Sequence, residues 1–452
     1  DTSTGSFVQQ MSAYDVFGRR TYQSLPNSSS GYHTTYDTRG RILSVKNPDS
    51  TTRSYEYVSH PAGGHGVNII DENNNLTSTQ YVYIGTTDRY ILNIFSPEDI
   101  ATAIDRDIFG KPVRVAQGEY FSDFSISALG HSYSYDVNQF LSAENKPGLG
   151  LIQYGRDEVG NMTYKIVGGV RVDYEYDSRN RLSDVYYSDS DLTVNLQYDP
   201  DGNVEAVSNA FTSRDYDYDA NGNLYAESLT IDTNIYNTTY FYDGLDHVRE
   251  ILYPSGRTVT YDPDALGRPT RAFPYVSAVS YFPNGSPERI TYGNGHESIF
   301  TQDSRQRIDT IQTGSLASLD YAYDPAGNVE QIIDQVNSSN SRAMNYDELN
   351  RLISVSSNAW GEATYSYDHY NNLVTKADPK GGRSLTHSTS NLMLTETSNS
   401  LNDRKLRFSY DGQGNITGIS EATYDGSNEP ITVFRNDTFF FNDANQLEIV
   451  WK

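Results

Sequence analysis

The chain has 452 residues and no cysteine, so disulfide bonds and thiolate metal sites are excluded. Hydrophobic residues make up only 36% of it, and 38 residues are tyrosine. The net charge of -25 argues against nucleic acid as a partner, because phosphate binding needs clustered Lys and Arg. No apolar run reaches the roughly 18 residues of a transmembrane helix, so the sequence predicts no membrane span.

A tyrosine–aspartate string recurs along the chain. It reads YDTRGRILSV from Tyr36, YDSRNRLSDV from Tyr176, YDPAGNVEQI from Tyr323 and YDELNRLISV from Tyr346. Clear successive copies begin 19 to 24 residues apart, which is the spacing of a repeat protein. The residues that we assign to the structural repeat motif are Tyr14, Asp15, Tyr36, Asp37, Tyr176, Asp177, Tyr198, Asp199, Tyr218, Asp219, Tyr242, Asp243, Tyr323, Asp324, Tyr346, Asp347, Tyr367, Asp368, Tyr410 and Asp411.

Each repeat has the pattern of a β-hairpin. In one copy, apolar and polar residues alternate in a run that ends with Tyr174, Tyr176 and Asp177. A short turn follows, and a second alternating run extends from Leu182 to Tyr186. Alternation with a period of two, punctuated by Gly and Asn, indicates half-buried strands. Two strands per repeat predict about forty strands over the whole chain.

The turn between the two strands has a physical explanation. An Asp at its start accepts backbone N–H bonds, and the Gly three residues later can adopt a positive φ. Copies with Asn in the Gly position, at Asn180 and Asn350, keep that option because Asn tolerates the left-handed region.

We therefore predict an all-β fold in which tandem hairpins form one long coiled sheet, because a twisted sheet of that length cannot stay flat. No linker divides the chain, so residues 1–452 are predicted to be a single domain. Three stretches lack a clean copy of the motif, near 58–70, 84–104 and 378–400, and an insertion or a functional loop would lie there.

These strings resemble the YD or Rhs repeat family, which includes bacterial Rhs toxins, components of Tc insecticidal toxins, wall-associated proteins and teneurins. The resemblance extends over nearly the whole chain. It implies a hollow shell or barrel-like body in which the β-ribbon winds around a cavity, and in the toxins the cavity encloses an unfolded toxic segment. The self-cleavage motif and the variable toxin segment of that family are not found before Lys452.

The sequence contains no phosphate-binding loop, zinc-protease motif, EF-hand or nucleophile elbow. Asp215, Asp217 and Asp219, followed by Asn221 and Asn223, superficially suggest calcium, but the bidentate Glu of a calcium loop is missing and repeat turns explain them better. We predict no metal and no cofactor.

The catalytic residues are unknown from the sequence alone. His60 and His65 are the candidates, because they lie in a Gly-rich interruption of the repeat where the backbone can reach a cleft. The other histidines are more easily explained as surface or packing residues.

Three functions stay open at this point. The first is a non-enzymatic shell or scaffold of a Rhs- or Tc-like toxin system, with a partner chain or an enclosed polypeptide cargo. The second is a stand-alone protein that binds or cleaves a polysaccharide, for example a uronate lyase that uses Tyr or His as base and Arg or His to neutralise the carboxylate. The third is a cell-surface adhesion module. All three imply a secreted or surface-exposed bacterial protein.

Overall fold

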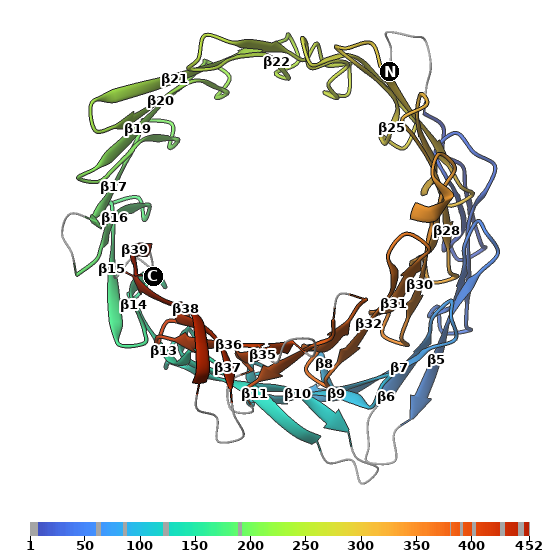
Figure 1. Ribbon diagram of the computed structural model, residues 1–452, viewed down its shortest axis with the longest axis horizontal. Coiled ribbons are helices and arrows are strands. Elements are labelled where there is room, and N and C mark those ends of the chain that lie inside the picture. Colours follow the sequence, from blue (N-terminus) through green and yellow to red (C-terminus); the bar gives the residue numbers. More distant parts are fainter. Residues whose placement is uncertain are drawn as a thin grey trace. The chain divides into compact units, whose positions relative to one another are not determined.

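The computed structural model describes residues 8–59, 65–84, 88–120, 126–188, 192–379, 381–388, 392–399, 404–424, 430–441 and 447–451. Over these residues the chain is a succession of β-strands, β1 to β39, with a short 3₁₀ turn, η2, between β29 and β30 (Figure 1). The prediction of an all-β fold is confirmed, and the strand number agrees with the two strands expected for each repeat.

The strands of the first sheet are β1 (Ser12–Tyr14), β2 (Arg20–Ser24), β3 (Gly31–Tyr36), β4 (Ile42–Lys46), β5 (Thr52–Ser59), β6 (His65–Ile70), β7 (Leu76–Ile84), β8 (Asp88–Ser96), β9 (Ile100–Arg106), β10 (Pro112–Tyr120), β11 (Ile126–Tyr135), β12 (Leu141–Lys146), β13 (Gly150–Arg156), β14 (Met162–Val167), β15 (Val170–Tyr176), β16 (Leu182–Tyr186), β17 (Val194–Tyr198), β18 (Val204–Ser208), β19 (Thr212–Tyr218), β20 (Leu224–Ile231), β21 (Asn234–Tyr242), β22 (Val248–Leu252) and β23 (Thr258–Thr260).

The elements of the second sheet are β24 (Val276–Tyr281), β25 (Pro287–Tyr292), β26 (Glu297–Gln302), β27 (Ile308–Thr313), β28 (Ala317–Tyr323), β29 (Val329–Asp334), the 3₁₀ turn η2 (Ser338–Asn340), β30 (Arg342–Tyr346), β31 (Leu352–Ser357), β32 (Gly361–Tyr367), β33 (Leu373–Ala377), β34 (Arg383–His387), β35 (Leu394–Asn399), β36 (Arg404–Tyr410), β37 (Ile416–Tyr424), β38 (Pro430–Phe441) and β39 (Leu447–Trp451).

The chain thus forms two long sheets, of 23 and 16 strands, where the sequence predicted one. The interruption lies between β23 and β24, where only isolated bridges occur. This segment contains Pro263, Pro269 and Pro274, and proline has no N–H to donate to a ladder. The prolines give a physical reason for the break.

Strands that are consecutive in sequence pair antiparallel with one another. In the β3–β4 hairpin, His33 faces Lys46 and Tyr36 faces Ile42, with a register shift between Thr35 and Tyr36. The same shift immediately before the repeat tyrosine recurs in β15, β19, β21, β28, β32 and β36. The bulge is therefore part of the repeat, and it re-aims the tyrosine at the end of its strand.

Successive hairpin turns alternate between the two edges of such a ribbon. The repeat Asp turns, from Asp15 and Asp37 in the first sheet to Asp411 in the second, lie on one edge, which we call the Asp edge. The intervening turns, such as the one at Asp49, form the opposite edge. The turn that starts at Asp71 is an exception, because it follows an even-numbered strand of the first sheet and lies on the opposite edge.

Few side chains are fully buried. Among the described residues the buried hydrophobic ones are Leu25, Val67, Ile100, Ala101, Ala116, Ile152, Leu192, Val259, Ala363 and Ala422. The accessible surface is 25965 Å², whereas a compact protein of this mass exposes about 17000 Å². Much of the ribbon is a single layer whose half-buried tyrosines and aliphatic residues take the place of a thick core.

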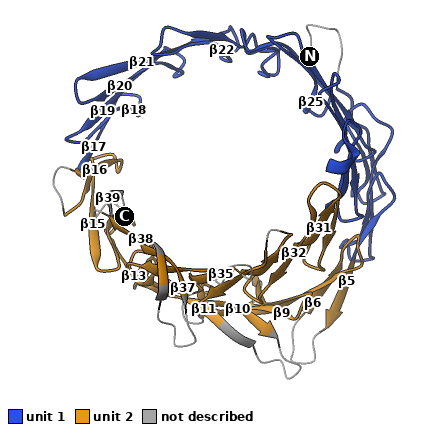
Figure 2. Ribbon diagram, viewed as in Figure 1, with its two compact units in different colours: residues 1–54, 193–342 blue, residues 55–192, 343–452 orange. Residues whose placement is uncertain are grey.

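The chain divides into two compact units (Figure 2). Unit 1 combines residues 1–54 with 193–342, and unit 2 combines residues 55–192 with 343–452. In each unit an early stretch of ribbon lies beside a later one. The single domain of residues 1–452 stays a prediction.

The three interruptions of the repeat pattern contain regular strands. Strand β6 lies in 58–70, β8 and the start of β9 lie in 84–104, and β34 and β35 lie in 378–400. No helix in the described part of the chain is long and apolar enough to cross a membrane.

Candidate functional site

The Asp of the repeat organises the turn of its hairpin. Asp37 Oδ1 accepts the backbone N–H groups of Arg39 and Arg41 at 2.8 and 2.9 Å, while Oδ2 accepts Arg41 Nε at 2.7 Å. The backbone N–H of Asp37 donates to the Arg41 carbonyl, and Gly40 has φ 83°. One carboxylate therefore satisfies two backbone donors and anchors one guanidinium.

The same carboxylate-to-backbone contact recurs along both sheets, and Asn180 and Asn350 have positive φ of 60° and 61° as the sequence predicts. Besides Asp37 it is made by Asp15, Asp177, Asp199, Asp219, Asp243, Asp324, Asp347, Asp368 and Asp411, and also by Asp71, Asp107, Asp136, Asp157, Asp264 and Asp303.

These hydrogen bonds favour the ionised carboxylate. The backbone N–H and the guanidinium of Arg41 lower the pKa of Asp37 below its ordinary value, and those of Arg181 lower the pKa of Asp177 in the same way. The backbone N–H of Asn223 has the largest effect on Asp219, whose pKa is also lowered.

The repeat tyrosine links one hairpin to the preceding one. The hydroxyl of Tyr242 donates to the Leu224 carbonyl at 2.7 Å, and the hydroxyl of Tyr176 donates to the Met162 carbonyl at 3.0 Å. Tyr36, Tyr218, Tyr323, Tyr367 and Tyr410 make the equivalent bond. Burial raises the pKa of Tyr242, so this hydroxyl keeps its proton and remains a donor near neutral pH.

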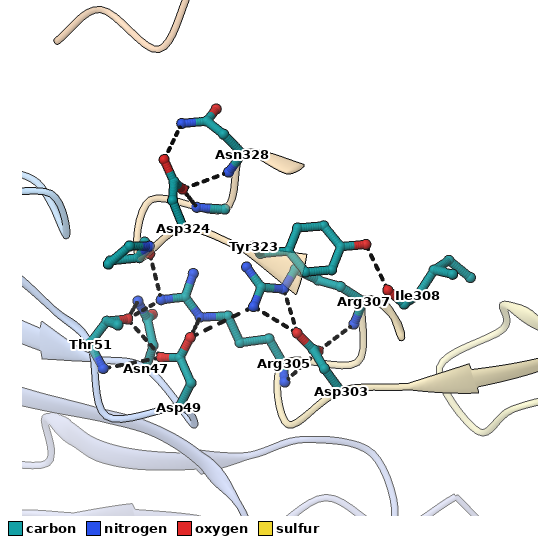
Figure 3. Close-up of polar contacts among 12 residues, drawn as sticks. Asn47, Asp49, Thr51, Asp303, Arg305, Arg307, Ile308, Tyr323, Asp324 and Asn328 are labelled. Carbon is teal, nitrogen blue, oxygen red and sulfur yellow. Dashed lines mark hydrogen bonds and ion pairs between the residues drawn. The ribbon is translucent and has the colours of Figure 1, made fainter. Parts of the chain in front are cut away.

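A polar cluster of Arg305, Asp49 and Thr51, which we call the clasp, joins the two stretches of ribbon within unit 1 (Figure 3). Arg305 lies two residues after Asp303 in a repeat turn, and its Nε lies 2.5 Å from Asp49 Oδ2. Its Nη2 donates to Thr51 Oγ1, 254 residues away in sequence, and to the Pro325 carbonyl at 3.0 Å. Arg305 is only 11% exposed, so the clasp is largely shielded from water.

Neighbouring groups support the clasp. Burial raises the pKa of Asp49, but hydrogen bonds from Thr51 and the Arg305 charge outweigh this effect and lower the pKa overall. Arg307 pairs with Asp303 at 2.7 Å and lies over the Tyr323 ring at 4.1 Å, as Figure 3 shows. The clasp thus builds on the contacts of an ordinary repeat turn.

Unit 2 has corresponding contacts between its early and late stretches. The turn at Gly168 packs so closely on the turn at Gly412 that a Cβ on Gly168 would lie 2.5 Å from the Gly412 carbonyl carbon. Gln117 Nε2 donates to the His369 carbonyl at 3.2 Å, 252 residues away in sequence. In both units, then, the Asp edge of the later ribbon contacts the opposite edge, or the strand residues near it, of the earlier one.

Two cavities lie between the stretches of unit 2. The larger, of about 550 Å³, is bounded by Ile100 and Gln117 of the early ribbon and by Arg351, Tyr367 and Asn371 of the later one. Arg351 is held by Asp347 at 2.6 Å and donates to Asn371 Oδ1 at 2.8 Å, so it is already committed to the repeat framework.

The smaller cavity, of about 300 Å³, is chemically more distinctive. Lys146 and Lys165 line it together with an apolar floor that includes Ile152, and neither ammonium group pairs with a described residue. Glu144, at its rim, accepts the hydroxyl of Tyr154 at 2.7 Å. Two cations above an apolar floor could hold a small organic anion.

His65 lies at the start of β6, and His60 lies outside the described residues. The His65 ring meets the edge of Tyr83 at a centroid distance of 5.8 Å, and the Arg89 guanidinium lies 3.9 Å from the centre of the Tyr81 ring. The registers place His65 opposite Tyr81 and Tyr83 opposite Arg89, so all four side chains share one face of β6, β7 and β8. The catalytic role of His60 and His65 stays a prediction.

The calcium-like string is used by the repeat framework. Asp219 accepts the backbone N–H groups of Asn221 and Asn223, and both amide side chains donate to Asp246 at 2.9 Å. Asp215 belongs to the strand β19. Within the described ranges, no group of three or more His, Asp or Glu side chains could hold a metal ion.

Sequence reasoning missed both the clasp and the cavity. Asp49 and Thr51 lie in a turn without the tyrosine motif, and Arg305 is one of many arginines in repeat turns. The sequence carries little signal for Arg305, because the same turn position is Arg39, Asn221 or Leu245 in other repeats. Its partner 254 residues away could not be read from that signal.

A family model described as RHS Repeat matches residues 242–272 and 346–383. Both matched segments contain repeat Asp turns, at Asp243, Asp264, Asp347 and Asp368. No curated protein sequence matches the chain.

The chain is also similar to solved toxin structures. It matches a chain of the TcdB2–TccC3–Cdc42 crystal structure with a TM-score of 0.72 and 13% identity, covering 97% of this chain and 27% of that one. The TcdB2–TccC3–TEV structure gives 0.70 and 14%, with 96% and 27% covered. The Tc holotoxin pore of Photorhabdus luminescens gives 0.63 and 14%, with 96% and 28% covered. At this identity the likeness shows the fold, and the chain spans little more than a quarter of these chains.

Proposed function

Because this chain is a member of the RHS (YD) repeat family, we propose that it serves as a non-enzymatic wall of a bacterial toxin-related assembly that encloses or presents a polypeptide cargo. In this proposal the ribbon of this chain already shields part of the cargo by itself, and a partner chain, or a longer protein of which the chain is part, completes the wall. The assembly would be secreted or surface-exposed.

The observation that carries the proposal is the use of the repeat residues. The Asp carboxylates, the turn arginines and the tyrosine hydroxyls are engaged in holding hairpins together, as in the contacts of Asp37, Arg41 and Tyr242. Side chains that are engaged in these structural hydrogen bonds stabilise a wall, and few of them remain to act as catalytic groups. The likeness to TcdB2–TccC3 chains over 97% of this chain adds support at the level of fold.

A protection assay tests the proposal. An unfolded polypeptide tail with one protease site is fused to either terminus of the full chain, and its cleavage rate is compared with that of the same tail on an unrelated folded monomer. We expect slower cleavage at one terminus at least, because the wall shields an enclosed segment from the protease. Equal cleavage rates at both termini and on the control would overturn the proposal.

A second candidate function has its own observation. His65, Tyr81, Tyr83 and Arg89 share one face of β6–β8, and such a set could bind a uronate sugar, with Tyr or His as base and Arg as the carboxylate partner. This polysaccharide-directed function is an alternative to the scaffold. The adhesion module stays a prediction.

Uronate-containing and neutral polysaccharides distinguish the candidates. Formation of unsaturated uronate is followed by absorbance, together with reducing ends, for the wild-type chain and for His65→Ala. His33→Ala is the matched control, because His33 is another exposed strand histidine beside a tyrosine, with ring centroids 4.7 Å apart. Activity that is lost in His65→Ala and kept in His33→Ala supports the lyase; no product from any polysaccharide rejects it.

A further inference from the structure

The turns of the Asp edge differ in solvent exposure between the two sheets. The second residue after the Asp is half-buried in the second sheet, at Arg305, Ala326, Leu349, Tyr370 and Gln413. The equivalent residue is exposed in the first sheet, at Phe17, Arg39, Phe109, Asn138, Val159, Arg179, Asp201, Asn221 and Leu245. This position is therefore covered where the Asp edge contacts another ribbon and uncovered where it does not.

Several uncovered turns in the first sheet carry large apolar side chains. Three successive Asp turns, between β9 and β14, place Ile108, Phe109, Val137 and Val159 at their tips, with exposed fractions of 82, 61, 95 and 66%. We call these four residues the apolar tips. Large apolar side chains are unfavourable at a turn tip that contacts only water. Several of them together on one edge indicate an interaction surface.

The opposite edge of the second sheet offers a complementary surface. Leu316 lies in the turn between β27 and β28, and Val336 lies between β29 and β30, both in unit 1. Their exposed fractions are 64 and 54%. This is the edge type on which the Asp edge rests within each unit, as the contacts of Asp49 and Gly168 show.

We infer that the apolar tips dock on the opposite edge of the second sheet of another copy of this chain, head to tail. The contact repeats between two copies the geometry that each unit already contains between its early and late ribbons. Apolar burial supplies the attraction in this contact, where polar contacts such as the Asp49–Arg305 ion pair join the ribbons of unit 1. Such a heterologous contact leaves one edge of each type open in every dimer, so longer assemblies follow.

Sedimentation velocity over a range of concentrations tests the inference with the full chain. The wild-type chain should associate further as its concentration rises. The double variant Phe109→Asp, Val159→Asp should stay monomeric, because it places carboxylates in the contact. The double variant Phe17→Asp, Leu245→Asp is the matched control, because it makes the same change at the same turn position outside the apolar tips, and it should associate as wild type does. A wild-type chain that stays monomeric at its solubility limit overturns the inference.

A mixing experiment establishes the direction of docking. Leu316→Asp, which alters only the opposite edge, should also be monomeric alone. Mixed with the Phe109→Asp, Val159→Asp chain, it should form dimers and nothing larger, because each variant keeps one intact edge. Mixtures that remain monomeric contradict head-to-tail docking. Cargo protection by a single chain is measured separately, so the two proposals can fail independently.

Discussion

At the scale of single residues, the repeat Asp is the group on which each turn depends. Asp199 Oδ1 accepts the backbone N–H groups of Gly202 and Asn203 at 2.7 and 2.8 Å, and its Oδ2 accepts the Asn203 amide at 2.9 Å. Removing the carboxylate takes away all three of these hydrogen bonds, although the Gly202 N–H also donates to the Asp199 carbonyl at 3.1 Å.

Asp199→Ala should therefore lower the free energy of unfolding, and by more than Asp201→Ala does, because only Asp199 accepts the hydrogen bonds of the turn. Asp201→Ala is the control, since it removes the same charge from the same turn, where Asp201 is exposed. Urea denaturation followed by far-ultraviolet circular dichroism measures both. If the two variants lose the same stability, charge rather than the turn bonds explains the effect.

The residue scale is also where the sequence was most informative. The Asp, the Gly three residues later and its Asn substitutes at Asn180 and Asn350 could be predicted, because turn chemistry is local. The turn at Asp71 was missed because Ile70 stands where the tyrosine is expected, although Asn74 has the required positive φ of 68°. The tyrosine partners were not predicted, since their carbonyls belong to the preceding hairpin.

At the scale of elements, the clasp between two ribbons of unit 1 depends on one side chain. Arg305 bridges the turn of Asp303 to Asp49 and Thr51, which no local pattern predicts because the partners are about 250 residues apart in sequence. The lysines of the smaller cavity are unpredictable for the same reason, since Gln413 of a distant turn closes the site beside Lys146 and Lys165.

Arg305→Ala should loosen this clasp without unfolding the hairpins. We expect faster amide hydrogen exchange in the segments 47–52 and 303–307, because local opening becomes easier when a shielded ion pair is lost. Arg39→Ala is the matched control, since Arg39 holds the same turn position and is exposed. Unchanged exchange in both segments would show that the clasp contributes nothing to the contact.

At the scale of the whole molecule, the lowered carboxylate pKa values make stability depend on pH. A carboxylate whose pKa is lower in the folded than in the unfolded state stabilises the fold above its unfolded pKa, and this stability is lost as pH falls through the folded value. Asp37, Asp177, Asp199, Asp219 and Asp243 all have lowered pKa values.

The midpoint of thermal unfolding should therefore fall steeply below about pH 4, where free Asp side chains begin to take up protons. Protonation also relieves the repulsion within a chain of net charge -25, which opposes the loss. We expect the loss to prevail because each turn carboxylate accepts several hydrogen bonds. Scanning calorimetry from about pH 7 to about pH 3 measures it, and a midpoint that rises on acidification would show that repulsion dominates.

In the proposed function, the repeats build a wall for a polypeptide and do not form an enzyme with a thick core. Electron cryomicroscopy of the purified full chain, carrying the unfolded tail, tests it most directly. We expect β1 to β39 in sequential hairpin order, a wall largely one sheet thick, and a bounded space wide enough for a polypeptide. Sheets packed face to face around a continuous apolar core, with no such space, would contradict it.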